Sequence, residues 1–216
     1  MSQLKPIARR LVALVGRCVG AAQIWWIGRR IGDRPVLVLD IDNTLADAWP
    51  SFLQASASER ERLAGLRALP GMKAATVGGR AGSGDGEPVV VFVSHRALWH
   101  WGTTRSWLRN MGYEVSIESL VLVSDPAEKI GHLRRLVGPA GRGGRSSGAP
   151  GALTYWDDLS HGTEHGETKL YDHVVREVHK LAESSGRRLT YHGLDDIEAV
   201  VAAAGGRTDG SSGTND

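Results

Sequence analysis

Five short runs of apolar residues constrain the fold of this chain more than any other feature of its sequence. Each run is rich in Val, Leu or Tyr, is too short for a helix, and alternates little with polar residues. This pattern is typical of parallel strands that are covered on both faces. The runs are VLVLDID (36–42), VVVFVS (89–94), SLVLVS (119–124), ALTYWDD (152–158) and LTYHG (189–193).

Helix-like stretches separate most of these runs, at about 99–111, 127–137, 168–183 and 195–204. Strands that alternate with helices predict an α/β fold, here a doubly wound, Rossmann-like three-layer sandwich with about five parallel strands. The chain of 216 residues is long enough for one domain with a substantial core. Polar residues follow several of the predicted strands, where open α/β sheets bind ligands.

The sequence divides into three predicted parts. Residues 1–34 form a basic N-terminal helix, 35–204 form the α/β domain, and 205–216 form a Gly- and Ser-rich tail predicted to be disordered. A small insertion at about 46–72, between the first two strands, is predicted to hold one helix and then a Pro-Gly turn. This insertion is too short for a second domain, and it could form a lip beside a site.

Composition narrows the environment and the partners. A single cysteine, Cys18, excludes an intramolecular disulfide and fits a reducing compartment, so a cytoplasmic location is expected. Residues 1–34 hold seven Lys or Arg against one Asp, whereas the rest of the chain is mildly acidic. The body therefore gives no electrostatic sign of nucleic-acid binding, and no nucleic-acid partner is predicted.

Two carboxylates, Asp40 and Asp42, end the first apolar run, and Asn43 and Thr44 follow at once. A carboxylate at a strand end can attack a phosphate ester and form an acyl-phosphate. A second carboxylate two residues further on points to the same side of an extended segment, where it could protonate the leaving oxygen and later activate water. Such chemistry needs positive charge, which Mg²⁺ or a lysine could supply. Alternatively, Asp-Asn-Thr could cap a helix or close a turn.

The sequence D-I-D-N-T (40–44) resembles motif I of the haloacid dehalogenase-like (HAD) superfamily, and three further motifs follow in the order of that family. The resemblance covers roughly residues 35–200. VFVSHR resembles motif II and ends its strand at Ser94, DPAEKIGHL offers the motif III lysine Lys129, and LTYWDDLSHG resembles motif IV with the acids Asp157 and Asp158.

The resemblance implies a role for each of these residues. Asp40 would be the nucleophile and Asp42 the general acid and base. Mg²⁺ would be held by the Asp40 carboxylate, the Asp42 backbone carbonyl and Asp157. Ser94 and Lys129 would bind the phosphoryl oxygens. Thr44 and Arg96 could support the site or contact substrate. Asp158 could do the same or serve as an alternative metal ligand.

An acid two residues after the nucleophile is typical of the phosphatases of this family. The resemblance therefore implies a Mg²⁺-dependent phosphatase with a minimal cap, acting on a phosphorylated substrate of unknown class. Two alternatives stay open: a phosphotransferase that uses the same site, and a catalytically silent HAD-like module tethered by its N-terminal helix. Taken alone, Ser94 could be a cap and Lys129 a solvated helix residue.

The segment after Ser94, HRALWHWGTTRSWLRNMGY, also resembles class C acid phosphatases and polynucleotide-kinase-type phosphatase domains. Arg96 or Arg105 could fork to a phosphate, and Trp99 could stack on a sugar or base. Trp107 is expected in the core. The sequence HGTEHGE (161–167) matches no common zinc spacing and is predicted to be a polar loop at the rim of the pocket.

Residues 4–32 have a helical period, with Ile7, Leu11, Leu14, Cys18, Ala22 and Trp25 on one face. Arg17 interrupts the apolar run, so a membrane-spanning helix is not expected. A basic amphipathic helix with tryptophan on its apolar face can lie on an anionic membrane surface, here peripherally at the inner membrane. The alternative is that it packs on the domain or on a second copy, as a homo-oligomer.

Overall fold

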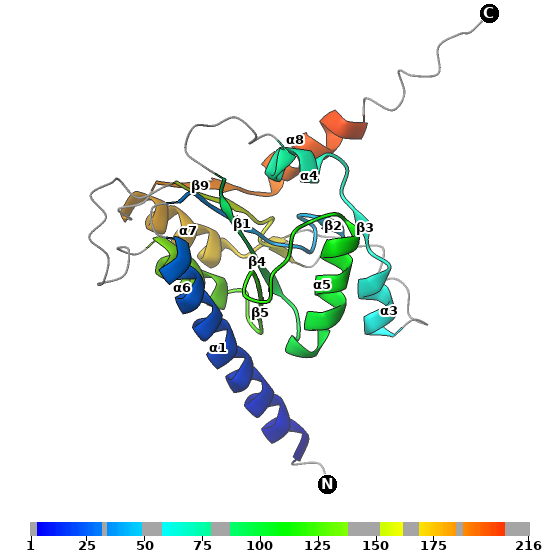
Figure 1. The fold of residues 1–216 in the computed structure, drawn as a ribbon, viewed down its shortest axis with the longest axis vertical. Helices are drawn as coiled ribbons and strands as arrows, with labels where there is room; N and C mark the ends of the chain where they lie inside the picture. Colours follow the sequence, from blue (N-terminus) through cyan, green and yellow to red (C-terminus); the bar gives the residue numbers. More distant parts are fainter. Residues whose placement is uncertain are drawn as a thin grey trace, which may run out of the picture.

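A five-stranded parallel sheet forms the middle layer of the fold (Figure 1). The computed structural model describes residues 4–31, 34–48, 58–78, 87–137, 152–161, 169–184 and 188–205. The strands, in spatial order, are β5 (Leu120–Val123), β4 (Val89–His95), β1 (Val36–Leu39), β6 (Leu153–Trp156) and β9 (Leu189–His192). Each neighbouring pair is parallel, so all five predicted strands and the predicted fold class are confirmed.

Helices cover both faces of the sheet because the strand side chains alternate between two apolar clusters. Val36 and Val38 of β1 face one cluster, whereas Leu37 and Leu39 face the other. The first cluster is covered by α1 (Leu4–Ile31), α6 (Glu128–Val137) and α7 (Asp172–Ser184). The second is covered by α4 (Met72–Thr76), α5 (Trp101–Asn110, preceded by the 3₁₀ turn η2, Leu98–His100) and α8 (Leu194–Gly205).

The predicted helices agree with the structure except near α7. Lys169 and Leu170, which were predicted to be helical, form β8 (Lys169–Leu170), which pairs antiparallel with β7 (Ser160–His161). Trp107 is buried as expected, and its indole N–H donates to the carbonyl of Leu66 at 2.8 Å. Gly205, predicted as the first residue of the tail, ends α8; the rest of the tail lies outside the described residues.

The insertion after β1 contains more structure than its sequence predicts. β2 (Ala46–Asp47) pairs antiparallel with β3 (Arg67–Ala68), and the expected helix, α3 (Glu59–Ala64), lies between them in the sequence. A capping box fixes the start of α3: the backbone N–H of Glu61 donates to the Ser58 hydroxyl, and the Glu61 carboxylate accepts from the Ser58 backbone. In the predicted Pro-Gly turn, Gly71 adopts φ 76° and is the N-cap of α4.

The N-terminal helix packs on the domain along its C-terminal half. Gly20, Ile24, Ile27 and Ile31 form the buried face of α1, which lies against β5 and α6. This face differs from the one predicted by periodicity, because Leu14 and Trp25 are 53% and 54% exposed. Apolar residues occupy both sides of the helix, so periodicity alone could not select the packing face. Among the described residues, no helix is long and apolar enough to cross a bilayer.

A buried histidine lies at the contact between α6 and α1. His132 is 5% exposed, and its ring lies near Gly20, where an added Cβ would be 3.4 Å from Cε1. Its Nδ1 has no hydrogen-bond partner among the described groups. Burial, and secondarily the positive charge of Arg135, lowers the pKa of His132 to about 4. At pH values between about 4 and the ordinary histidine pKa of about 6.5, His132 is therefore neutral in the folded protein and protonated in the unfolded chain.

This difference predicts a loss of stability in acid. In the unfolded chain the pKa of this histidine is about 6.5. The contribution of neutral His132 to the unfolding free energy is therefore lost as the pH falls from about 6.5 towards about 4. Replacing His132 with Leu should reduce, by about 2 kcal/mol, the drop in unfolding free energy between about pH 7 and about pH 4.5. Urea titrations at the two pH values measure this difference. An equal drop in both proteins would show that His132 does not titrate in this range.

Candidate functional site

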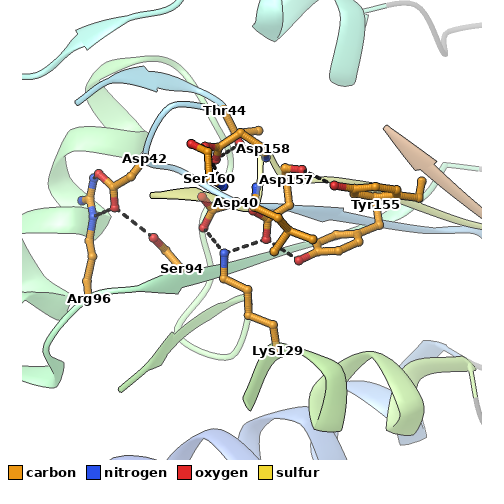
Figure 2. A network of polar contacts seen from close by, with 12 residues as sticks. Asp40, Asp42, Thr44, Ser94, Arg96, Lys129, Tyr155, Asp157, Asp158 and Ser160 are labelled. Carbon is orange, nitrogen blue, oxygen red and sulfur yellow. Dashed lines mark hydrogen bonds and ion pairs between the residues drawn. The ribbon is translucent and has the colours of Figure 1, made fainter. Parts of the chain in front are cut away.

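The predicted site residues gather at the carboxyl end of the sheet, around the central strand β1 (Figure 2). Asp40 directly follows β1, and Asp157 directly follows the neighbouring strand β6. The chain winds from β1 to β4 and β5 on one side and reaches β6 and β9 on the other. The site therefore lies at the topological switch point, where open α/β sheets form their binding crevice.

The ammonium of Lys129 connects the two strand ends. Its Nζ lies 3.0 Å from Asp40 Oδ1 and 2.6 Å from Asp157 Oδ2. Lys129 is in the first turn of α6 and is 4% exposed. Burial alone would lower its pKa, but the attraction of Asp157 and Asp40 outweighs burial and raises it above the ordinary lysine value. The lysine is therefore protonated and holds both carboxylates.

Further hydrogen bonds fix Asp157, including one from its backbone N–H to the His192 carbonyl at 3.1 Å. The Tyr155 hydroxyl donates to Oδ2, the Leu159 backbone N–H donates to Oδ1 at 2.9 Å, and the Tyr191 hydroxyl donates to the Asp157 carbonyl at 2.9 Å. Leu159 has φ 46°, a backbone region that a leucine rarely occupies. Non-glycine residues in such rarely occupied backbone regions are found preferentially at functional sites, and Leu159 lies two residues after Asp157.

Asp158 links the loop after β6 to the loop after β1. The Thr44 hydroxyl accepts from the Asp158 backbone N–H at 3.1 Å and donates to Asp158 Oδ1 at 3.3 Å. Ser160 donates to Oδ2 through both its hydroxyl and its backbone N–H. Burial, and then the nearby charge of Asp157, raises the pKa of Asp158 to about 6. Thr44 and Asp158 are therefore in direct mutual contact, and their supporting role stays a prediction.

Asp40, Asp157 and Asp158 form a buried triad that could hold a metal ion. Each offers one carboxylate oxygen, and these oxygens lie within 4.8 Å of one another. Their residues are 3%, 1% and 3% exposed. Oxygen ligands of this kind suit hard divalent cations such as Mg²⁺ or Ca²⁺. The structure thus brings together two of the predicted metal residues, Asp40 and Asp157, with Asp158, which was predicted as an alternative ligand.

The electrostatics of the triad fit a cation. When all three are ionised, the carboxylates carry more negative charge than the single Lys129 ammonium can balance. Burial raises the pKa of Asp40 well above its usual value; Lys129 opposes this, and the charges of Asp157, Asp42 and Asp158 add to it. Asp40 Oδ1 is buried and makes no hydrogen bond among the described groups, although the Lys129 ammonium lies within ion-pair distance. A divalent ion would relieve this excess of negative charge.

Asp42 belongs to a second group of side chains. Its carboxylate points towards Arg96 and Ser94, while Asp40 lies among the triad acids (Figure 2). Arg96 donates to both oxygens, at 2.7 Å through Nε and 2.6 Å through a terminal nitrogen, and Ser94 donates at 3.2 Å. Burial would raise the pKa of Asp42, but the charge and hydrogen bonds of Arg96, together with Ser94, lower it below its ordinary value.

The pairing with Asp42 changes the interpretation of Arg96. Its guanidinium fork, predicted as a possible phosphate ligand, is directed at Asp42, and its other terminal nitrogen donates to the Thr104 hydroxyl at 3.0 Å. The Arg96 side chain is 3% exposed, so the arginine is a fixed part of the site. Contact of Ser94 with a phosphoryl group, and coordination by the Asp42 carbonyl, stay predictions.

A hollow of about 320 Å³ lies beside Asp42. One wall comes from α3 of the insertion, and the others come from the ends of β4 and β5. The lining residues are Asp42, Glu59, Arg62, Leu63, His95, Arg96, Ala97, Val123 and Ser124. The helix α3 of the insertion therefore forms one side of this hollow, next to Asp42.

The other candidates on η2 and α5 contact one another and the insertion. Trp99 is 66% exposed and lies against His100, and His100 pairs with Glu59 of α3 at 3.1 Å. The Arg105 guanidinium lies over the Trp101 ring at 5.5 Å. Of the predicted rim loop at 161–167, all but residue 161 lies outside the described residues.

Four residues of the site were not singled out from the sequence: Tyr155, Ser160, Tyr191 and Thr104. Tyr155 precedes Asp157 by two residues, so strand periodicity could have placed both on the same side. Tyr191 is the register partner of Tyr155 in β9, which no local pattern shows. Thr104 lies on α5 and reaches Arg96 only through the tertiary fold.

Comparison of the chain with protein-family models, with curated proteins and with solved structures finds no match. The fold and the site therefore define its class by geometry: an α/β protein with a five-stranded parallel sheet and a buried aspartate triad that could hold a metal ion.

The triad predicts stabilisation by a divalent cation. Mg²⁺ at about ten times its dissociation constant should add about 1.4 kcal/mol to the unfolding free energy and raise the thermal midpoint. Asp157→Asn should abolish this increase, whereas Asp195→Asn, an exposed acid on α8, should keep it. Thermal unfolding of each variant with and without Mg²⁺, after treatment with a chelator, measures the effect. A wild-type midpoint indifferent to Mg²⁺, Mn²⁺ and Ca²⁺ would exclude the site.

The Arg96–Asp42 pair predicts a second pH dependence. It arises from a carboxyl pKa lowered by an ion pair, whereas that of His132 arises from a histidine pKa lowered by burial. Replacing Arg96 with Gln should cost about 1–3 kcal/mol at neutral pH, because a partly buried carboxylate loses its cation. A lowered folded pKa contributes stability above the unfolded carboxyl pKa, and this is lost as the pH falls through the lowered value. The difference between wild type and variant should therefore shrink below about pH 4.

Thr104→Val provides the matched control for Arg96→Gln, because it removes the other Arg96 contact and keeps the pair with Asp42. Its cost should be smaller and should not shrink in acid. Chemical denaturation across the pH range measures both differences. A cost of Arg96→Gln that is independent of pH would contradict the assigned pairing.

Proposed function

We propose that this protein is a Mg²⁺-dependent phosphatase that hydrolyses a phosphate monoester through an aspartyl-phosphate on Asp40. The observation that carries the proposal is the position of Asp40, between the Lys129 ammonium at 3.0 Å and two further carboxylates within 4.8 Å. Phosphoryl transfer requires positive charge beside the nucleophile, since the transferred group is anionic. Lys129 supplies one such charge, and the two further carboxylates would hold the metal ion that supplies the rest. The likeness of four sequence motifs to the HAD superfamily points to the same reaction.

In the proposed reaction an Asp40 oxygen attacks phosphorus, and the bond between phosphorus and the ester oxygen breaks. The leaving oxygen takes a proton from Asp42 and departs as an alcohol. Asp42, now ionised, takes a proton from water as the water attacks the phosphorus of the aspartyl-phosphate. Inorganic phosphate leaves, and both Asp40 and the proton on Asp42 are restored.

Asp40, the Asp42 backbone carbonyl and Asp157 would hold Mg²⁺, with Asp158 in support. When bound there, the ion supplies positive charge that favours ionised Asp40 and offsets the charge of the phosphoryl group. Lys129 supports the same end by its contact with Asp40 and Asp157. Ser94, which donates to Asp42 at 3.2 Å, would turn its hydroxyl to a phosphoryl oxygen.

Arg96 gives the proposed acid and base a defined starting state. Its fork lowers the pKa of Asp42, which suits the second step, in which an ionised carboxylate accepts a proton from water. The first step needs a protonated Asp42, and an anionic phosphoryl group close to it would raise its pKa. Arg96 thus acts in the proposal as a positioning residue that fixes Asp42.

The hollow beside Asp42 is where the leaving group of the substrate would lie. Its volume of about 320 Å³ is near the lower end of ligand-site volumes, about 300–1,000 Å³. Arg62 and Leu63 of α3 line it together with His95, which offers a basic, an apolar and a polar contact. A phosphate carried on a small organic group, or on an exposed group of a larger molecule, fits this arrangement.

Hydrolysis of a generic aryl phosphate by the purified protein tests the proposal. Activity should require Mg²⁺, and Asp40→Asn should lower kcat by about 10³-fold or more, because an amide is not a nucleophile here. Asp195→Asn makes the same chemical change on the exposed surface of α8 and should leave kcat unchanged. Undiminished turnover by Asp40→Asn would exclude the aspartyl-phosphate.

Adding a short-chain alcohol to the same assay separates hydrolysis from phosphotransfer. Hydrolysis predicts equal amounts of aryl alcohol and inorganic phosphate, with no new ester. A phosphotransferase would release less phosphate than aryl alcohol and would form the alkyl phosphate, since the same Asp40 intermediate would be passed to the added alcohol.

A further inference from the structure

Helix α1 has two apolar faces, and the domain covers one of them. Gly20, Ile24, Ile27 and Ile31 are buried against the domain. A second set of large apolar residues on the helix remains exposed: Leu14 (53%), Val15 (47%), Val19 (40%), Trp25 (54%) and Trp26 (53%). Their spacing places them along one side of the helix, and we call them the outer face of α1.

The outer face continues over three turns of the helix and ends beside a cation. The Trp25 and Trp26 rings meet edge to face with centroids 6.3 Å apart, and the Arg29 guanidinium lies 4.8 Å from the Trp25 centroid. Soluble proteins rarely expose a contiguous apolar patch of this kind unless it binds a partner. Figure 1 shows that the first turns of α1 extend beyond the rest of the domain.

Charge identifies the partner. The sequence of α1 contains six Lys or Arg and no acidic residue. Two such helices from two copies would bring like charges together, which disfavours self-association through this face. A nucleic acid would match the charge but would gain nothing from Leu14, Val15 and Val19. A membrane surface with anionic lipids matches both the charge and the apolar side chains.

We propose that the outer face of α1 binds the surface of an anionic membrane, with the helix lying in the plane of the interface. Leu14, Val15 and Val19 insert below the headgroups, and the two tryptophans with Arg29 lie at headgroup level, where Trp and Arg are favoured. The opposite face of α1 keeps the domain attached. This binding requires no catalysis, so it does not depend on the proposed phosphatase activity.

Cosedimentation of the full chain with lipid vesicles tests the proposal, under reducing conditions because Cys18 is exposed. The probes are vesicles of phosphatidylcholine alone and of phosphatidylcholine mixed with phosphatidylglycerol. The protein should bind the anionic vesicles at least about tenfold more tightly than the neutral ones, and high salt should weaken this binding. The double variant Trp25→Ser/Trp26→Ser should lose about tenfold or more of the affinity for anionic vesicles.

Trp99→Ser is the matched control, since Trp99 is 66% exposed on η2 rather than on α1. It should bind anionic vesicles as the wild type does, and circular dichroism should show that both variants are folded. Equal binding of wild type and the double variant would overturn the proposal. So would a dimer that the double variant converts to a monomer without any vesicle binding, or binding to duplex DNA in place of vesicles.

Discussion

The ion pairs of Lys129 are the interaction on which the rest of the site depends. One ammonium, supplied by the first turn of α6, lies within 3.0 Å of a carboxylate after β1 and within 2.6 Å of one after β6. Buried acids at neighbouring strand ends would repel one another without it, and burial of a charge is costly unless it is paired. The lysine therefore lets the sheet place Asp40 and Asp157 together, and the remaining carboxylate charge is one that a divalent cation could balance.

The acids of the site are divided by their surroundings into two kinds. Burial and mutual repulsion raise the pKa values of Asp40 and Asp158, whereas Arg96 and Ser94 lower that of Asp42. Titratable groups whose pKa values are pushed apart in one site are typical of acid–base catalysis. Here the pKa values differ because the side chains point in different directions. The triad faces Lys129, whereas Asp42, which follows Asp40 by two residues on the same loop, faces Arg96 (Figure 2).

Sequence reasoning anticipated the elements whose pattern is local. Five apolar runs predicted five strands, and the polar residues at several strand ends predicted a binding edge of the sheet. The resemblance to the HAD superfamily, rather than any local pattern, implied that Asp40, Lys129 and Asp157 meet there. The hairpin of β2 and β3 escaped prediction because each strand has two residues and pairs across the insertion. The packing face of α1 was ambiguous because both its sides are apolar. The partner of Arg96 is set by a tertiary contact 54 residues away, which no spacing reveals.

The central claim is that folding assembles three carboxylates into a cation site. Anomalous diffraction from crystals of the protein soaked with Mn²⁺ measures this directly. A single manganese peak bounded by the carboxylates of Asp40 and Asp157, with Asp158 adjacent, is the predicted result. Well-ordered density for the three acids with no peak among them at saturating Mn²⁺, or a peak elsewhere on the surface, would contradict it.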